Sequence, residues 1–574
     1  MSFKSIDLEE VYLVKPPHSC DTSCGDPCTR YTEIEAEESK TAEPGDSLAQ
    51  HLARYHGMIK RVDLLYDPIV ERFPLEIITT IFGLCLPKQR RALLPQDLLD
   101  GKIDNAGALF ALGAVCKTWR QIIWSTPHFW SHIYIPIHPS NIENTITFVK
   151  DWIDRTGQMP LSLAVYFSQE DGFQDEDYEW LSKVKPLSAI VNATSSRWEC
   201  LDLKLPPRLL NLFSGSPSNL LELRVSNIGF PPEEDDDGEV ESASFIVHSA
   251  SKPRPTYAMI DSVPLQSIDI LWDNVTRVLL KECKMEECFE LLRLAPKLME
   301  CMFGFIRADD ESILVPVSHH NLKVLKLFFP KDPDITAAFF DGFTLPELEV
   351  LNIQSFNEIL PAENLISLIR RSSCRLYSLE IKAVLEEQNL LSLFRAVPSL
   401  EQLTLSPSPN EEYTSRNFFK LIAETTHIID KSEADSTSSA TPTNPNFLPE
   451  LQTLAYSTTS PGECESIWDI IPDLFGKDGS DYDDEGKDLT PHIRKRPLDT
   501  LTVSFDHWPW SGTPLRNPGY ISKPTLDRIE KLLDMGHCDI DIMLWGGQNS
   551  EPVDFIESSI AHHFPQKQFE VQVE

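Results

Sequence analysis

The sequence predicts an α/β solenoid with a parallel β-sheet, preceded by a short all-α helical unit. Three observations in the 574 residues predict this fold. A strand-like pattern, with apolar residues at positions i, i+3 and i+5, recurs many times after residue 195. Apolar helical segments lie before several of its copies. Two separate blocks of strongly apolar helical pattern lie between residues 67 and 130, before the first copy.

The recurring pattern has the spacing of a structural repeat. Its copies begin at residues 198, 220, 265, 275, 298, 322, 348, 376, 400, 451 and 498, and from 298 to 400 the intervals are 24, 26, 28 and 24 residues. Leucine-rich repeats have periods of about 20–29 residues and the strand signature L-x-x-L-x-L. We therefore expect an irregular leucine-rich-repeat horseshoe. The interval from 265 to 275 is too short for both positions to begin a repeat.

Each predicted repeat joins an apolar helix to a strand. In "NLLSLFRAVPSL", Leu390 and Phe394 share one helical face, and Pro398 ends the helix before Leu400 begins a strand. One such unit cannot bury both its helix and its strand, whereas stacked units cover one another. The strands are expected to form a concave sheet with the helices outside.

The pattern divides the chain into several regions. The N-terminal region contains "EIEAEESKTAEPGD" with little apolar periodicity, which is typical of disorder, and Leu48, Leu52 and Tyr55 begin an apolar helical stripe after it. The acidic and low-complexity runs indicate solvated loops, or alternatively docking sites for a basic partner. We expect a disordered acidic tail (1–45), an amphipathic helix (46–66), the small helical domain (67–137), a linker with the first solenoid elements (138–195), repeats (196–510) with loop inserts (231–256, 428–447, 476–490), and a C-terminal cap (511–574) whose "CDIDIML" is a strand.

Composition argues against several functions. The net charge is −37, from 51 basic and 88 acidic side chains, so nucleic acid and anionic lipid are poor partners. No run of 18 apolar residues and no secretory signal appear, which predicts a cytoplasmic or nuclear protein with reduced thiols among its 12 cysteines. "HIRKRP" at 492–497 resembles a basic import signal, but acidic residues flank it.

No catalytic or cofactor motif is evident. "HSCDTSCGDPC" offers His18, Cys20, Cys24 and Cys28 as metal ligands, but it lacks the C-x2-C pair of most structural zinc sites. A solvated tail is therefore favoured over a metal site. The histidine pairs at 319–320 and 562–563 are expected in exposed loops. The sequence predicts a non-catalytic protein without cofactor or metal.

The blocks before the repeats form short apolar helices. Pro74 suits the first turn of a helix, and Leu75, Ile78, Ile81 and Phe82 then form an apolar stripe. A second helical pattern runs through "AGALFALGAVCKTWRQIIW". A unit of about 60 residues cannot bury this much apolar surface alone. It needs a neighbouring domain or a partner protein to cover it.

These blocks, "FPLEIITTIFGLCLP" and "VCKTWRQIIWSTPHFW", resemble an F-box. Its pattern is a Leu-Pro-x-Glu start, an Ile-Phe pair, Val-Cys-x-x-Trp-Arg and a final Pro-x-x-Trp. The sequence departs from it at Phe73, where Leu is usual, and in the long stretch 88–105. With the strand "SHIYIPI" the layout is similar to F-box proteins of mushroom-forming fungi, in which leucine-rich repeats can follow the F-box. The matching residues are Pro74, Glu76, Ile81, Phe82, Val115, Cys116, Trp119, Arg120, Pro127 and Trp130.

The resemblance implies a substrate-recognition subunit of an SCF-type cullin-RING E3 ubiquitin ligase. The F-box would dock on the Skp-type adaptor and the repeats would bind an unknown target protein. The alternative is a leucine-rich-repeat interaction scaffold with no ligase role. Each interface residue has an alternative place in the core of the small domain. The resemblance implies that the adaptor interface or its immediate support comprises Pro74, Leu75, Ile77, Ile78, Ile81, Phe82, Cys116, Trp119 and Ile122.

The strand pattern also predicts which side chains face a target. Positions i+3 and i+5 are core, so positions i+2, i+4 and i+6 lie on the concave face by period-two alternation. Phe328 is the one large apolar side chain in this set, which makes it the expected anchor, unless a neighbouring loop covers it. The set comprises Val324, Lys326, Phe328, Val350, Asn352, Gln354, Ser378, Glu380, Lys382, Gln402, Thr404 and Ser406.

Overall fold

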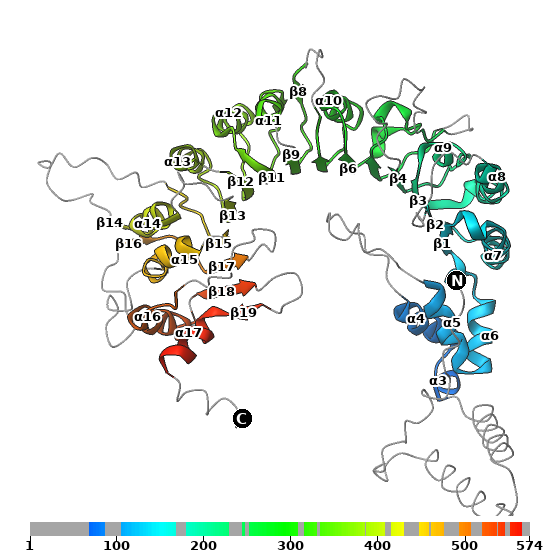
Figure 1. Ribbon diagram of the computed structural model, residues 1–574, viewed down its shortest axis with the longest axis horizontal. Coiled ribbons are helices and arrows are strands. Elements are labelled where there is room, and N and C mark those ends of the chain that lie inside the picture. Colours follow the sequence, from blue (N-terminus) through cyan, green and yellow to red (C-terminus); the bar gives the residue numbers. More distant parts are fainter. Residues whose placement is uncertain are drawn as a thin grey trace, which may run out of the picture. The chain divides into compact units, whose positions relative to one another are not determined.

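The computed structural model describes most of the chain after residue 67, in two compact units. The helical unit ends at Phe129 and the sheet unit begins at Trp130, and each is described here by itself (Figure 1). The described residues are 68–86, 105–167, 179–228, 244–246, 252–307, 315–329, 333–384, 386–407, 415–429, 447–458, 461–475, 493–506, 519–536, 538–545 and 552–564.

The helical unit consists of short helices packed around a few apolar side chains. A half-turn joins the last two α-helices, because Cys116 is extended and its Sγ accepts a hydrogen bond from the Trp119 backbone N–H at 3.4 Å. The Arg120 Nε donates to the Gly113 carbonyl at 2.8 Å and ties these helices together. The α-helices are α3 (Pro68–Arg72), α4 (Leu75–Cys85), α5 (Asn105–Val115) and α6 (Lys117–Ser125), and the 3₁₀ helix η2 (Pro127–Trp130) runs across the boundary to the sheet unit.

The sheet unit contains a 15-stranded sheet in which neighbouring strands follow chain order. Every neighbouring pair is parallel except β18 and β19, which are antiparallel. The strands are β1 (His132–Ile137), β2 (Leu161–Phe167), β3 (Trp198–Leu205), β4 (Glu222–Asn227), β5 (Tyr257–Asp261), β6 (Arg277–Lys281), β7 (Glu300–Gly304), β9 (Val324–Phe329), β11 (Val350–Ile359), β12 (Ser378–Val384), β13 (Gln402–Pro407), β15 (Thr453–Thr458), β17 (Thr500–Asp506), β18 (Asp539–Trp545) and β19 (Val553–Asp554).

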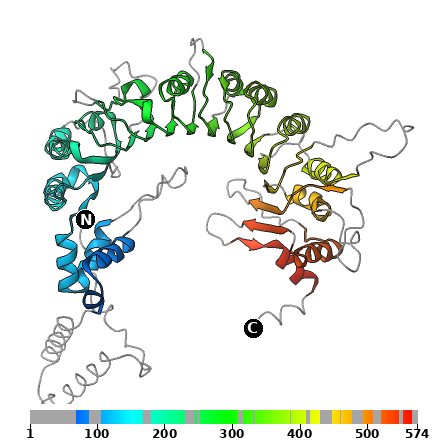
Figure 2. The same ribbon diagram turned by 180° about the vertical axis from the view of Figure 1, so that it is seen from behind.

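Helices connect the strands, and both ribbon views place α7 to α13 on one face of the sheet (Figures 1 and 2). We call the opposite face of the sheet the inner face. Small sheets pair β8 (Val317–Ser318) with β10 (Phe343–Thr344), and β14 (His427–Ile429) with β16 (Ile493–Lys495). The helices are α7 (Ile142–Arg155), α8 (Glu179–Asn192), α9 (Pro207–Leu210), α10 (Met285–Leu294), α11 (Pro333–Asp341), α12 (Ala362–Ser372), α13 (Glu387–Ala396), α14 (Ser415–Thr426), α15 (Pro461–Ile467), α16 (Lys523–Asp534) and α17 (Phe555–His563).

Short 3₁₀ helices complete the connections: η3 (Pro139–Asn141), η4 (Ser195–Arg197), η5 (Leu265–Ser267), η6 (Trp272–Asn274) and η7 (Ile471–Phe475). Aromatic side chains fill the layer between helices and sheet. The Phe289 and Phe343 rings stack with centroids 4.2 Å apart. Gly342 fits beside them because any Cβ there would lie 2.2 Å from the Phe289 Cζ.

One backbone contact recurs where the units stack. The carbonyl of the residue before a strand accepts hydrogen bonds from two successive N–H groups of the next unit. Met299 accepts from Lys323 and Val324 at 2.9 and 3.0 Å, and Glu401 accepts from Gln452 and Thr453 at 2.8 and 3.0 Å. This shared carbonyl sets the strand register, whatever the length of chain between the strands.

The coarse prediction, an α/β solenoid with a parallel sheet, is confirmed, whereas its assignment to leucine-rich repeats stays a prediction. Every predicted start except 265 lies at the first residue of a strand or two residues before it. The residue at 265 begins η5 instead. The core positions i+3 and i+5 are buried, as at Leu325, Leu327, Leu351 and Ile353.

Three boundaries differ from the prediction. Residues 132–137, expected in the small helical domain, form β1, the first strand of the large sheet. The insert expected at 231–256 contains Phe245, which is fully buried and bridges to Ile268. The insert expected at 428–447 begins inside β14 and ends at the buried Phe447. The tail (1–45), the helix (46–66) and the insert (476–490) lie outside the described residues.

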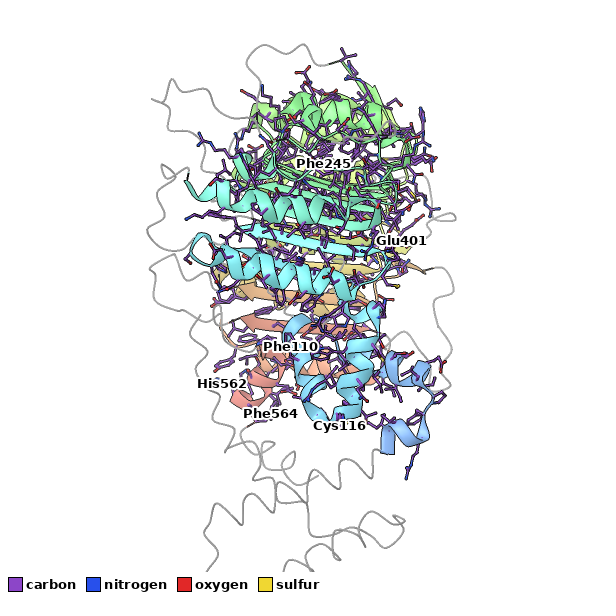
Figure 3. All side chains as sticks on the ribbon, turned by 90° about the vertical axis from the view of Figure 1, so that its right-hand side faces the viewer. Phe110, Cys116, Phe245, Glu401, His562 and Phe564 are labelled. Atoms are coloured by element: carbon purple, nitrogen blue, oxygen red, sulfur yellow. The ribbon has the colours of Figure 1, made fainter. Side chains whose placement is uncertain are left out.

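The predicted cap continues the solenoid before closing it. Its strand β18, close to the predicted 538–544, pairs parallel with β17. The final strand β19 then turns back antiparallel and leads into α17, which carries His562 and ends just before Phe564 (Figure 3). The Asp554 carboxylate caps α17 by accepting from the Ile556 and Glu557 N–H groups.

Candidate protein-interaction surfaces

The adaptor residues predicted on α4 divide between two faces of the helix. Ile78 and Phe82 point inward and are 1% exposed. Leu75 is 53% exposed and Ile77 45%, and Pro74 is also exposed. Ile81 is half-buried. The helix therefore presents part of the predicted set and uses the rest as core.

Helical periodicity explains this division. Ile78 and Phe82 are four residues apart, and the Phe82 ring packs on Trp119 with centroids 4.6 Å apart. Ile77, Ile81 and Leu84 recur at steps of four and three on another face. Leu84, which is 65% exposed, was not in the predicted set. We call Ile77, Ile81 and Leu84 the α4 stripe.

The predicted residues around α6 are mostly half-buried. Cys116 and Trp119 keep partial exposure, whereas Ile122 is buried. The prediction missed Phe110 and Val115, which are large, apolar and exposed (Figure 3 labels Phe110 and Cys116). Ile78, Phe82 and Ile122 are enclosed by this chain, so of the two predicted places, interface or immediate support, they occupy the second. These three residues support the surface from below.

The predicted target residues do lie on one face of the sheet. In the strand register Asn352 pairs with Lys326 and Glu380, and Gln354 pairs with Phe328 and Lys382. All members of the set are half-buried or exposed, while the residues that alternate with them are buried. Ion pairs lie along this inner face, joining Lys326 to Glu300 at 3.4 Å and Lys382 to Glu380 at 2.9 Å.

Sequence reasoning missed an apolar cluster on the same face. Tyr257, Met259, Leu279 and Met302 pack together and are only 1–6% exposed, with the half-buried Phe328 against them. We call these five residues the inner apolar cluster. In the repeats that start at 275 and 298, position i+4 of the strand pattern is Leu279 and Met302, so alternation along the strand also places these two residues on this face. The strand "YAMID" lacked a preceding leucine and gave no signal.

Two arginines flank the cluster at Tyr257. The Arg224 Cζ lies 5.2 Å from the centre of the Tyr257 ring, and the Arg277 Cζ lies 5.6 Å from it. Arg224 also pairs with Glu222, with Nη2 3.5 Å from the carboxylate. Burial raises the pKa of the Tyr257 hydroxyl, so Tyr257 stays neutral and presents an uncharged ring to both cations.

The histidine pair at 319–320, expected in an exposed loop, has one buried member. His319 is buried: its Nε2 lies 3.1 Å from the Ala295 carbonyl, and its Nδ1 accepts from the Leu322 N–H at 3.1 Å. Burial lowers the pKa of His319. His562 and His563 are exposed, as expected, but they lie in the last turn of α17 and not in a loop.

Arg496 in "HIRKRP" is also buried. Its guanidinium donates to backbone carbonyls and threonine hydroxyls, and burial lowers its pKa to about 10. Because its side chain is buried, Arg496 is not accessible to an import receptor in the folded chain. Its acceptors are the carbonyls of Ile422, Phe447 and Leu448 and the hydroxyls of Thr425 and Thr426.

Within the residues that the structure describes, no three His, Cys, Asp or Glu side chains lie together as a metal site would require. None of their helices combines the length and the apolar character needed to cross a bilayer. His18, Cys20, Cys24 and Cys28 lie outside these ranges.

Comparisons with known proteins add little. No protein-family model and no curated protein matches the chain. It is similar to the crystal structure of a protein from Bacteroides fragilis determined by the Northeast Structural Genomics Consortium. The identity is 11%, the match covers 74% of this chain and 77% of the other, and the TM-score is 0.23. At this TM-score the likeness carries no argument.

Proposed function

We propose that the chain is a non-catalytic substrate receptor of an SCF-type cullin-RING ubiquitin ligase. The resemblance of residues 67–137 to an F-box supports this proposal. The helical unit docks on a Skp-type adaptor, and the inner face of the sheet unit binds the target protein. The ligase's other subunits then carry out the chemistry, while this chain supplies proximity and orientation.

The α4 stripe is the observation that carries the proposal. Ile77 and Leu84 are large aliphatic side chains, yet they stay 45% and 65% exposed. Each buried methylene contributes about 0.8 kcal/mol, so covering these side chains with a partner is strongly favourable. Interfaces between helices have apolar anchors at their centres and few charges. The stripe has this chemistry and lies directly above Ile78 and Phe82, which hold the helix in place.

Co-expression with a Skp-type adaptor tests the docking. We expect the full chain to co-elute with the adaptor in size-exclusion chromatography. The double variant Ile77→Glu/Leu84→Glu should abolish co-elution, because it places two charges in an apolar interface. The matched control Gln121→Glu adds a charge at an exposed position of α6 and should leave co-elution unchanged.

Folding is checked separately by the thermal unfolding of each variant. The exposed stripe variants should unfold with the wild type, within about 0.5 kcal/mol. If the wild-type chain never binds the adaptor, the proposal fails and the alternative, an interaction scaffold without a ligase role, replaces it.

A further inference from the structure

We propose that the inner face binds an acidic peptide segment of its target protein at strands β4 to β9. An Asp or Glu carboxylate of the segment binds the Arg224–Arg277 pair, and an apolar side chain packs on the inner apolar cluster at Phe328. This inference rests on the proposed function only in taking the sheet as the target surface. It names the chemical class of the target segment.

The arginine pair provides the carboxylate site. The Arg224 and Arg277 guanidiniums, from β4 and β6, lie 5.2 and 5.6 Å from the centre of the Tyr257 ring, so both cations flank this ring on the inner face. The Arg224 Nε is buried and has no hydrogen-bond acceptor among the described residues. No ion pair joins Arg277 to an acid within the same residues. Arg277 therefore offers its charge to a ligand carboxylate.

The neighbouring acids offset this pair only in part. Glu222 pairs with an Nη of Arg224 and leaves Nε unsatisfied. Asp202 lies across the strand pair from Arg224 and is a second counter-ion for it. Arg277 therefore carries most of the charge available to a ligand. Guanidinium groups bind carboxylates through paired, charge-assisted hydrogen bonds.

The second half of the site is the exposed edge of the apolar cluster. Phe328 is half-buried, whereas its cluster partners are almost fully enclosed and form a firm floor beneath it. Gly304 pairs with Phe328 in the register and is buried, because the Lys281 stem covers it, with Cγ 3.2 Å from where a Cβ of Gly304 would lie. An apolar side chain of the segment packs on top of the Phe328 ring and against this aliphatic stem.

The sheet geometry sets the spacing of the two anchors. Arg277 and Phe328 are two strands apart, which is about 10 Å, and four residues apart along the strand direction, which is about 13 Å. The diagonal is about 16 Å, the length of about five extended residues. The segment therefore carries its acid about five residues from its apolar anchor.

Charge explains why an acidic partner selects this place. The chain as a whole carries −37, so most of its surface repels an acidic segment. On the inner face of β5 to β9, the cations Arg277, Lys281 and Lys326 outnumber the acids Asp261 and Glu300. Because Lys326 pairs with Glu300 and Asp261 lies beside Lys281 in the register, Arg277 is the cation that gives this part of the face its positive sign.

Fluorescence anisotropy with the purified full chain and no adaptor tests the inference. The probe is a labelled Gly/Ser-based peptide with two Asp residues and a Leu about five residues away. Companion peptides replace Asp with Asn, replace Leu with Ser, replace Asp with Lys, or replace Asp with phosphoserine. We expect the Asp–Leu peptide to bind, binding to weaken as salt is raised, and each of the first three replacements to weaken it at least about tenfold.

Variants locate the site. Arg277→Gln and Phe328→Ala should each weaken binding of the Asp–Leu peptide about tenfold, and Arg277→Lys should weaken it less. The control Lys382→Gln removes the same charge on β12 of the same face, where Lys382 pairs with Glu380, and should have no effect. Unchanged thermal unfolding shows that the variants are folded.

Four outcomes would overturn the inference: no binding of the Asp–Leu peptide, equal binding of the Lys peptide, equal losses in Lys382→Gln and Arg277→Gln, or tight binding of the phosphoserine peptide alone. Adaptor co-elution is measured without any peptide. The failure of this inference and the failure of adaptor docking are therefore separate results.

Discussion

The helical unit and the inner face of the sheet both carry apolar side chains outside their main cores, with different outcomes. On α4, Ile77 and Leu84 stay largely exposed, because the short helices that the structure describes here provide no further layer over them. On the inner face, Leu279 and Met302 are almost fully buried by their neighbours on adjacent strands. In-register stacking provides each apolar residue with partners, whereas an isolated helix must find them on another molecule.

The sharpest way to test this contrast is within α4 itself. Phe82→Ala removes a ring that is 1% exposed and packs on Trp119, so we expect a loss of about 3–5 kcal/mol from the unfolding free energy. Ile77→Ala, on the exposed face, should change it by no more than about 0.5 kcal/mol. Urea unfolding followed by hydrogen exchange at α4 and α6 measures both. Equal costs would show that the two faces are not distinct.

The sheet unit also buries a charged side chain, Arg496, whereas other arginines of the same unit stay exposed. Replacing it in Arg496→Met leaves the carbonyls of Phe447 and Leu448 without their donors. We expect a loss of about 2–4 kcal/mol, measured by chemical denaturation. Arg416→Met, at an arginine whose ion pair with Asp469 is largely exposed, is the control and should cost at most about 1 kcal/mol. An Arg496 effect no larger than this would contradict its role.

Two glycines of the helical unit separate tight packing from open space. A Cβ at Gly113 would lie 2.6 Å from the Trp124 Cζ3, so Gly113→Ala should cost about 1–3 kcal/mol. A Cβ at Gly83 in α4 meets no atom of the described residues within 4 Å, so Gly83→Ala should stabilise the unit by up to about 1 kcal/mol. Thermal unfolding compares the two. Destabilisation by Gly83→Ala would mean that α4 is covered from that side.

The smallest effect concerns pH. Burial holds the pKa of His319 below its ordinary value of about 6.5, so the unfolded chain binds a proton more readily than the folded chain. Stability from this site is full above about pH 6.5 and is lost as the pH falls toward the lowered pKa. His319→Asn should show a shallower fall in Tm over this window. Identical profiles for the variant and the wild type would place the titration elsewhere.

Much of the sheet could be predicted, because a period-two pattern with leucines at fixed positions leaves a clear signal. Leu325 and Leu327 are buried where this pattern puts them. The strand "YAMID" at β5 was invisible because its core and inner faces are both apolar, which removes the alternation. The exposure predicted for His319 was wrong because its ring contacts the carbonyl of Ala295, 24 residues away, which no local pattern encodes.

The candidate surfaces could be predicted less well than the strands. The spacing on α4 grouped Ile77, Ile78 and Phe82, yet the side of the helix that turns inward depends on Trp119 and Phe129, which come from another helix. The inner-face residues followed from alternation alone. The arginines beside Tyr257 are brought together only by the register of three strands.

The shared carbonyl at the start of each strand has a consequence for engineering. The same carbonyl contact forms across connections of different length. It joins Glu401 to Gln452 across a long connection and Tyr377 to Glu401 across a shorter one. A peptide tag or sensor domain inserted between such points leaves the ladder intact. The pairing between strands is thereby kept constant while the segments that connect them vary in length and sequence.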